Sequence, residues 1–118
     1  MERRQLIEQF LSLEGITRDE DPKNEAIFEL DRLAHAEPEV AWALILEILA
    51  REPSQRAIAA LAAGPLEDLI DEHGPQFIER IELLARRDPK FRHLLGGVWE
   101  SSTSQIWARV EAARVNAW

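Results

Sequence analysis

Residues 38–51 read PEVAWALILEILAR and are apolar on nearly every side of a helix. Proline suits the first position of a helix, because the N–H group that it lacks would have no partner there. A helix that is apolar nearly all round is usually buried against several neighbours. The stretch therefore predicts a central, buried helix over residues 38–51, with Trp42 in the core.

The same pattern of proline followed by apolar residues at helical spacing recurs along the chain. Prolines stand at positions 22, 38, 53, 65, 75 and 89, and we expect each to begin a helix. The expected helices cover about 2–13, 22–36, 38–51, 54–62, 65–73, 75–87, 89–95 and 103–116. Gly15 is expected to end the first helix and Gly74 to cap the fifth, with an acidic loop over residues 17–21. No stretch has the alternation of a strand.

A weak internal repeat supports an all-α fold. Residues 33–38, 49–53 and 84–89 each place Leu-Ala shortly before an acid and a proline, which describes a helix end, a tight turn and a helix start. We predict a single domain over residues 1–118, a compact bundle of about seven to eight short helices built from antiparallel pairs. A solenoid-like (HEAT-like) stack of the same pairs is the alternative.

Composition excludes several classes of function. The 22 Asp and Glu residues outnumber the 14 Lys and Arg residues, and the net charge of -8 argues against a nucleic-acid partner. The chain has no cysteine, and it has no apolar run long enough to span a membrane and no signal peptide, so a cytoplasmic location is expected. It also has no phosphate-binding loop, no nucleophile motif and no histidine pair at metal-ligand spacing. We therefore expect no cofactor, no metal and no enzymatic activity.

The most unusual stretch is GPLEDLIDEHG at residues 64–74, which holds four carboxylates and a histidine. Glu67 and Asp71 are four residues apart, as are Asp68 and Glu72, so each pair shares a face of the expected helix. The first explanation is structural: acids in the first turn and His73 in the last turn would interact favourably with the helix dipole and stabilise the helix. The others are contact with a partner, and cation binding or acid–base chemistry.

Two further groups stand out. Arg86, Arg87, Lys90, Arg92 and His93 form a basic cluster that either pairs with nearby acids or holds a phosphate or an acidic peptide. Four tryptophans without a tyrosine are also unusual, and Trp99, Trp107 and Trp118 gather near the C-terminal end of the sequence. They suit either packing of the last helix or a surface for a partner or a second copy.

Several of these elements together resemble an uncharacterised bacterial family of small all-helical proteins. The resemblance covers residues 38–107 and rests on Trp42-Ala43, on GPLEDL at 64–69 with His73-Gly74, and on Asp88-Pro89, Phe91-Arg92, Leu94-Leu95 and Val98-Trp99. It implies a bacterial, cytoplasmic, stand-alone helical module, and it carries no catalytic role.

The function that these observations favour is a non-catalytic protein–protein interaction module, for example an acidic immunity or inhibitor protein that covers a basic partner. The candidate partner-binding residues are Glu67, Asp68, Asp71, Glu72, His73, Trp99 and Trp107. One alternative is a self-associating structural or regulatory protein, a homodimer through its last helix. The other is a carboxylate-based enzyme or ligand carrier.

Overall fold

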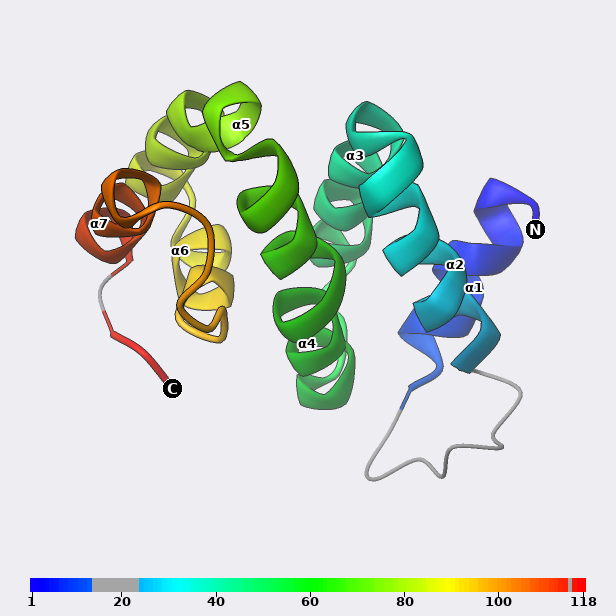
Figure 1. Ribbon diagram of the computed structural model, residues 1–118. Helices are drawn as coiled ribbons and strands as arrows, with labels where there is room; N and C mark the ends of the chain where they lie inside the picture. The colour runs from blue at the N-terminus through cyan, green and yellow to red at the C-terminus, as the bar shows by residue number, and fades with distance from the viewer. Residues whose placement is uncertain (14–23, 115) are drawn as a thin grey trace.

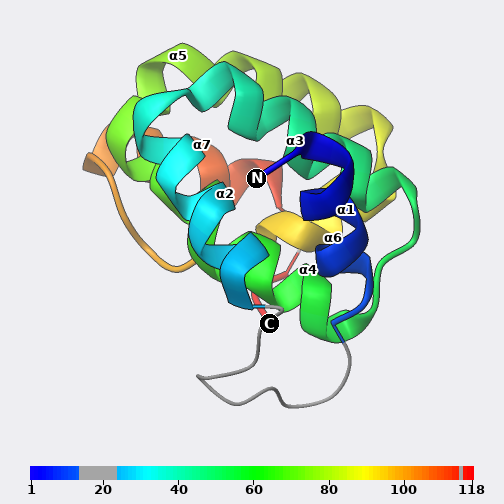
Figure 2. The same ribbon diagram turned by 90° about the vertical axis from the view of Figure 1, so that its right-hand side faces the viewer.

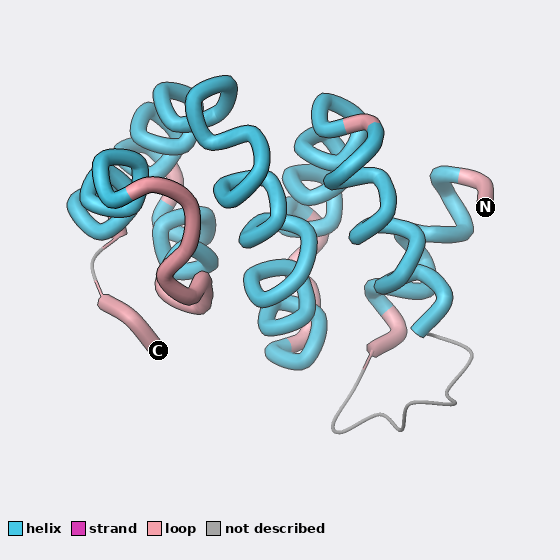
Figure 3. Tube along the Cα trace, viewed as in Figure 1, coloured by secondary structure: helices cyan, strands magenta, loops and turns pink. Residues whose placement is uncertain are grey.

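The computed structural model describes residues 1–13, 24–114 and 116–118, and all the regular structure in them is helical (Figure 3). The all-α prediction is therefore confirmed. The elements are α1 (Arg3–Leu11), α2 (Asn24–Ala36), α3 (Pro38–Ala50), α4 (Gln55–Leu61), the π-helix η1 (Ala62–Leu66), α5 (Glu67–Arg87), α6 (Pro89–Leu95) and α7 (Ser104–Ala113). Figure 1 shows them following one another from α1 and α2 at one end to α7 at the other.

The apolar stretch that predicts a central helix forms α3, which packs against α1, α2, η1 and α5. The Trp42 ring lies 5.5 Å from that of Phe77 in α5 and 5.6 Å from that of Phe91 in α6, so its place in the core is confirmed. Val40 is exposed. The helix therefore keeps one outward side and is not enclosed all round.

Pro38 and Pro89 begin helices as expected. Pro38 is the first residue of α3 and Pro89 is the first residue of α6, where the Asp88 carboxylate accepts a hydrogen bond from the Lys90 N–H. Pro53 precedes Ser54, whose hydroxyl caps α4 by accepting from the Ala57 N–H. Pro22 lies outside the described residues, as do Gly15 and the expected acidic loop over residues 17–21.

The prediction that Pro65 begins a helix is wrong, because the chain is helical from residue 55 through Pro65 to the kink at His73. Pro65 lies inside η1, and the wider π-turn accommodates a residue that lacks an N–H and crowds the preceding turn. By contrast, α5 consists of two helical stretches that meet at His73, whose backbone is not helical (φ -129°, ψ 26°), and Pro75 lies at the start of the second stretch as expected. The boundary expected between the helices over 65–73 and 75–87 is therefore present as this kink.

Gly74 follows the kink without the positive φ of a left-handed helix cap, and its small size serves packing. A Cβ atom at this position would lie 3.0 Å from Ile106 Cγ2 and 3.1 Å from Ser102 Oγ. The absence of a side chain lets the start of α7 approach α5 closely.

The helices pack into one compact body. The Cα radius of gyration is 13.3 Å, close to the ~13.5 Å expected for a compact chain of this length. Figure 2 looks along the row of helices, with α1 and α2 in front of the later ones. Within the described ranges, no helix is both long enough and apolar enough to cross a membrane.

Candidate functional site

The acidic segment (residues 67–73) forms the first two turns of α5, and its side chains point to two different sides. Leu66, the residue before it, is itself helical, and no side chain caps the start of α5. The explanation from the helix dipole therefore does not hold for Glu67 and Asp68, because the helix does not begin there. Their carboxylates must be explained by their tertiary contacts.

One side of the acidic segment holds the loop between α6 and α7 (residues 96–103, the α6–α7 loop). Glu67 Oε1 accepts a hydrogen bond of 3.1 Å from the Trp99 N–H, and Asp71 Oδ1 accepts one of 2.9 Å from the Ser102 N–H. Ser102 has a positive φ of 65°, a backbone conformation that L residues seldom adopt. Burial raises the pKa of the Glu67 carboxyl, and the bond from Trp99 opposes that change. Two carboxylates of α5 thus fix the backbone of this loop.

The other side of the segment faces α2 and meets His35. The Nε2 atom of His35 lies 3.5 Å from Asp68 Oδ2, and its Nδ1 atom contacts Glu72 Oε2. The hydrogen bond with Glu72 raises the pKa of His35, and the charges of Glu72 and Asp68 add to this. Burial raises the pKa of Asp68, against the lowering effect of His35.

Asp31, one helical turn before His35 on α2, completes this group. Burial raises the pKa of its carboxyl from 3.8 to about 6, and the charge of Asp68 contributes. Its Oδ1 atom is buried and has no hydrogen-bond partner within the described part of the chain. A Cβ atom on Gly64 of η1 would lie only 2.6 Å from that oxygen, so glycine is what lets Asp31 fit against the π-turn.

His73 stands at the kink of α5 and does not act on its own helix end. Its Nε2–H donates a hydrogen bond of 3.2 Å to the backbone carbonyl of His35, in the last turn of α2. That carbonyl would otherwise be one of the unpaired acceptors at a helix C-terminus. His73 therefore joins α5 to α2.

The two candidate tryptophans have different environments. Trp107 is buried in α7, with the Arg114 guanidinium 4.9 Å from its ring centroid, which favours packing of the last helix as the role of this residue. Trp99 is 76% exposed. It borders a groove of about 450 Å³ (the Trp99 groove), which is lined by Gly96, Val98, Trp99, Glu100, Trp107, Glu111, Arg114, Ala117 and Trp118.

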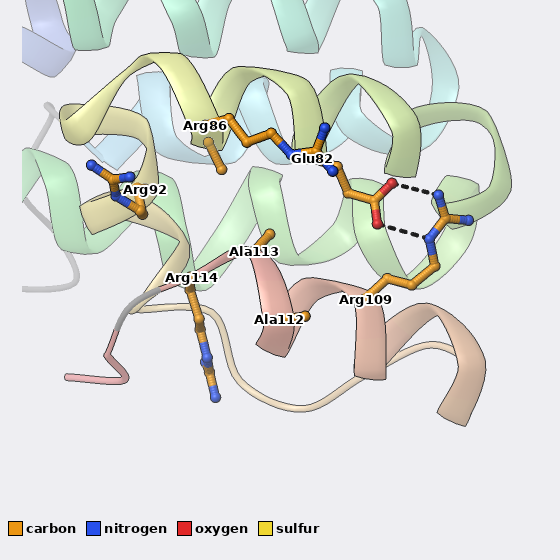
Figure 4. Close-up of a pocket in the computed structure, with 8 residues that line it drawn as sticks. Glu82, Arg86, Arg92, Arg109, Ala112, Ala113 and Arg114 are labelled. Atoms are coloured by element: carbon orange, nitrogen blue, oxygen red, sulfur yellow. Dashed lines mark hydrogen bonds and ion pairs between the residues drawn. The ribbon is translucent and has the colours of Figure 1, made fainter.

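The basic cluster disperses in the structure. Arg86 and Arg92 line a pocket of about 330 Å³ with Arg109 and Arg114, but Arg109 is paired with Glu82 at 2.9 and 2.5 Å. Figure 4 shows Arg92 and Arg114 extending away from that pair, so the guanidinium groups do not converge on one point. Lys90 pairs with Glu52 at 3.4 Å, and the His93 ring stacks on Trp118 with centroids 5.3 Å apart.

Sequence reasoning selected the acidic segment but missed Asp31 and His35. Their spacing of one helical turn on α2 was the available signal. No motif links α2 to α5, because the two helices are brought together only by the fold.

Comparison with known proteins identifies the family. Residues 16–118 match the model of a family of unknown function (DUF6869). The chain belongs to this family. No curated protein and no solved structure gives a significant match. The match confirms the expectation that the chain belongs to an uncharacterised family, and it covers most of the chain.

Proposed function

We propose that this DUF6869 protein is a non-catalytic interaction module that docks onto a basic partner protein through Trp99. The observation that carries the proposal is the contrast within the α6–α7 loop. The Trp99 side chain is 76% exposed, whereas the backbone N–H groups of Trp99 and Ser102 are held by Glu67 and Asp71.

A fixed backbone favours binding, because little conformational freedom is then lost when the partner docks. Tryptophan is among the residues that most often dominate the energy of an interface. In this proposal the role of Glu67 and Asp71 is to position Trp99, and Trp99 makes the main contact with the partner. Asp68, Glu72 and His73 face α2 and lie outside the contact.

Charge supplies the class of partner. Glu100 and Glu111 line the Trp99 groove, and Asp71 is exposed close by on α5. Arg114 lies in the same groove, where its guanidinium is engaged by the Val98 carbonyl at 3.0 Å and by the Trp107 ring and also pairs with Glu111 at 4.0 Å. The whole chain has a net charge of -8. Together with the acids around the groove, this charge would attract a basic protein and speed its association. An immunity or inhibitor protein that covers a basic toxin or nuclease is the most specific form of the proposal.

The proposal includes a cytoplasmic location and a bacterial origin, which the resemblance implies. Its alternative is self-association through the C-terminal helix, since Trp99 and the partly exposed Trp118 both border the groove. Light scattering over a range of concentrations separates the two. A constant monomer mass is expected, and a mass that rises to the dimer would favour the alternative.

The direct test is to isolate binding partners from the native cells with tagged full-length protein, and then to measure the affinity of the purified partner by calorimetry. Trp99→Ala should weaken binding at least about 30-fold, as loss of a strong interface anchor does. Phe28→Ala is the matched control, because Phe28 is an exposed aromatic residue on α2 (66% exposed). A partner that binds the Trp99 variant as tightly as the wild type would refute the docking surface.

A further inference from the structure

We infer that His35, Asp68 and Glu72 form a binding site for one divalent transition-metal ion of the zinc type. One ligand atom from each of these residues lies within 4.8 Å of the other two. The three residues come from two helices, α2 and α5, so the fold itself brings them together. The site is separate from the Trp99 surface and does not depend on the proposed docking function.

The donor set selects the class of metal. An imidazole with two carboxylates is a ligand set that zinc accepts, whereas calcium and magnesium prefer oxygen donors alone. Zinc binds nitrogen and oxygen ligands at about 2.0–2.2 Å, which places two ligands of a tetrahedral ion about 3.3 Å apart. In the structure Asp68 faces Nε2 of His35 and Glu72 faces Nδ1, so one carboxylate must turn to the nitrogen that the other faces before the three groups hold one ion. Three protein ligands leave a fourth position open for water or a small ligand.

The site carries more negative than positive charge, and a bound cation would neutralise the excess. The carboxylates of Asp68 and Glu72 both lie against His35, which can supply only one positive charge. The side chains of Asp31 and Asp68 are also partly buried. Carboxylates in such a setting are stabilised by pairing or by a metal ion.

Asp31 supplies an independent observation. Its buried Oδ1 atom receives no hydrogen bond from any described residue, and a buried polar atom of this kind calls for an ion or a water as its partner. The oxygen occupies the space beside Gly64 on the π-helix η1, a distortion that is frequent at functional sites.

The test is calorimetric titration of ZnCl₂ into the metal-free full-length chain at pH 7.5, with the folded state of every variant checked by circular dichroism. We expect one ion per chain, at least tenfold weaker binding in His35→Ala and in Glu72→Gln, and little binding of MgCl₂. Glu25→Gln and His93→Asn change an acid and a histidine that lie elsewhere on the surface, and both should bind zinc as the wild type does.

Two outcomes would overturn the site. One is zinc binding that is absent or does not saturate in the wild type. The other is equal affinity in the wild type and in a folded His35→Ala variant, which would show that the ion binds elsewhere. Equal binding of magnesium and zinc would also count against it, since a nonspecific acidic surface would then suffice.

Discussion

Replacing Asp31 by asparagine is expected to stabilise the protein at neutral pH. The substitution keeps the size of the side chain beside Gly64 but removes a charge that burial disfavours. A shift of the pKa from 3.8 to about 6 is roughly two units, and each unit corresponds to about 1.36 kcal/mol. Because Asp31 is only partly buried, solvent screening reduces the expected gain to about 1–2 kcal/mol at pH 7.5.

The sign of the pH dependence follows from the direction of the shift. Since the pKa of Asp31 is higher in the folded state, the protonated form favours folding. That contribution is fully present below pH 3.8 and is lost as the pH rises through about 6. The asparagine variant should therefore gain its advantage over the wild type between these values and keep it above them.

Urea unfolding, followed by tryptophan fluorescence with EDTA present, measures the difference between pH 4 and pH 7.5. For a chain of 118 residues, the gain at pH 7.5 corresponds to a rise in Tm of about 4–8 °C. Glu25→Gln, on the same helix, controls for the loss of one negative charge. The reasoning would be refuted if Asp31→Asn were less stable than the wild type at pH 7.5, or if the difference did not change with pH.

Two further predictions concern other contacts. Because the bond to Glu72 raises the pKa of His35, an NMR titration should place that pKa above 6.5 and show it falling in Glu72→Gln. The His35–Glu72 pair should stabilise the fold below pH 6.5, and this stabilisation should be lost as the pH rises through the raised pKa of His35. An unchanged pKa of His35 in Glu72→Gln would contradict the role of that bond. Gly96→Ala should displace residues 116–118, because its Cβ would lie 2.2 Å from the Asn116 carbonyl oxygen and 2.6 Å from the Trp118 ring. We expect trypsin to cleave the variant faster after Arg114, and the free energy of unfolding to fall by about 1–3 kcal/mol. Cleavage at the wild-type rate would contradict the displacement of residues 116–118.

Helical periodicity predicted most of the elements, because each amphipathic or apolar stretch carries its own local signal. The starts of α3 and α6 at Pro38 and Pro89 followed from the same local chemistry. The break expected before Pro75 is present as the kink at His73. The rule failed at Pro65, where apolar residues on both sides continue to be buried: Leu61, Ala62, Leu66, Leu69 and Ile70. Packing along this whole run outweighs the local tendency of proline to begin a new helix.

The acidic segment was found from its composition, but its role was not. Only the fold shows that Glu67 and Asp71 hold a loop 31–32 residues further along the chain, while Asp68 and Glu72 meet a histidine on α2. Likewise, the sequence does not distinguish Trp99 from Trp107, whereas in the structure Trp99 is exposed and Trp107 is buried.

The sequence by itself determined that this protein is acidic and all-helical, that Trp42 lies in the core and that residues 67–72 carry unusual chemistry. These properties depend on composition and on spacings of a few residues, which a helix converts directly into faces. The tertiary structure alone decided the continuous helix through Pro65, the pairing of α2 with α5 and the exposure of Trp99. Those depend on contacts between residues far apart in the chain, where burial is shared by several helices and no local pattern records the partner.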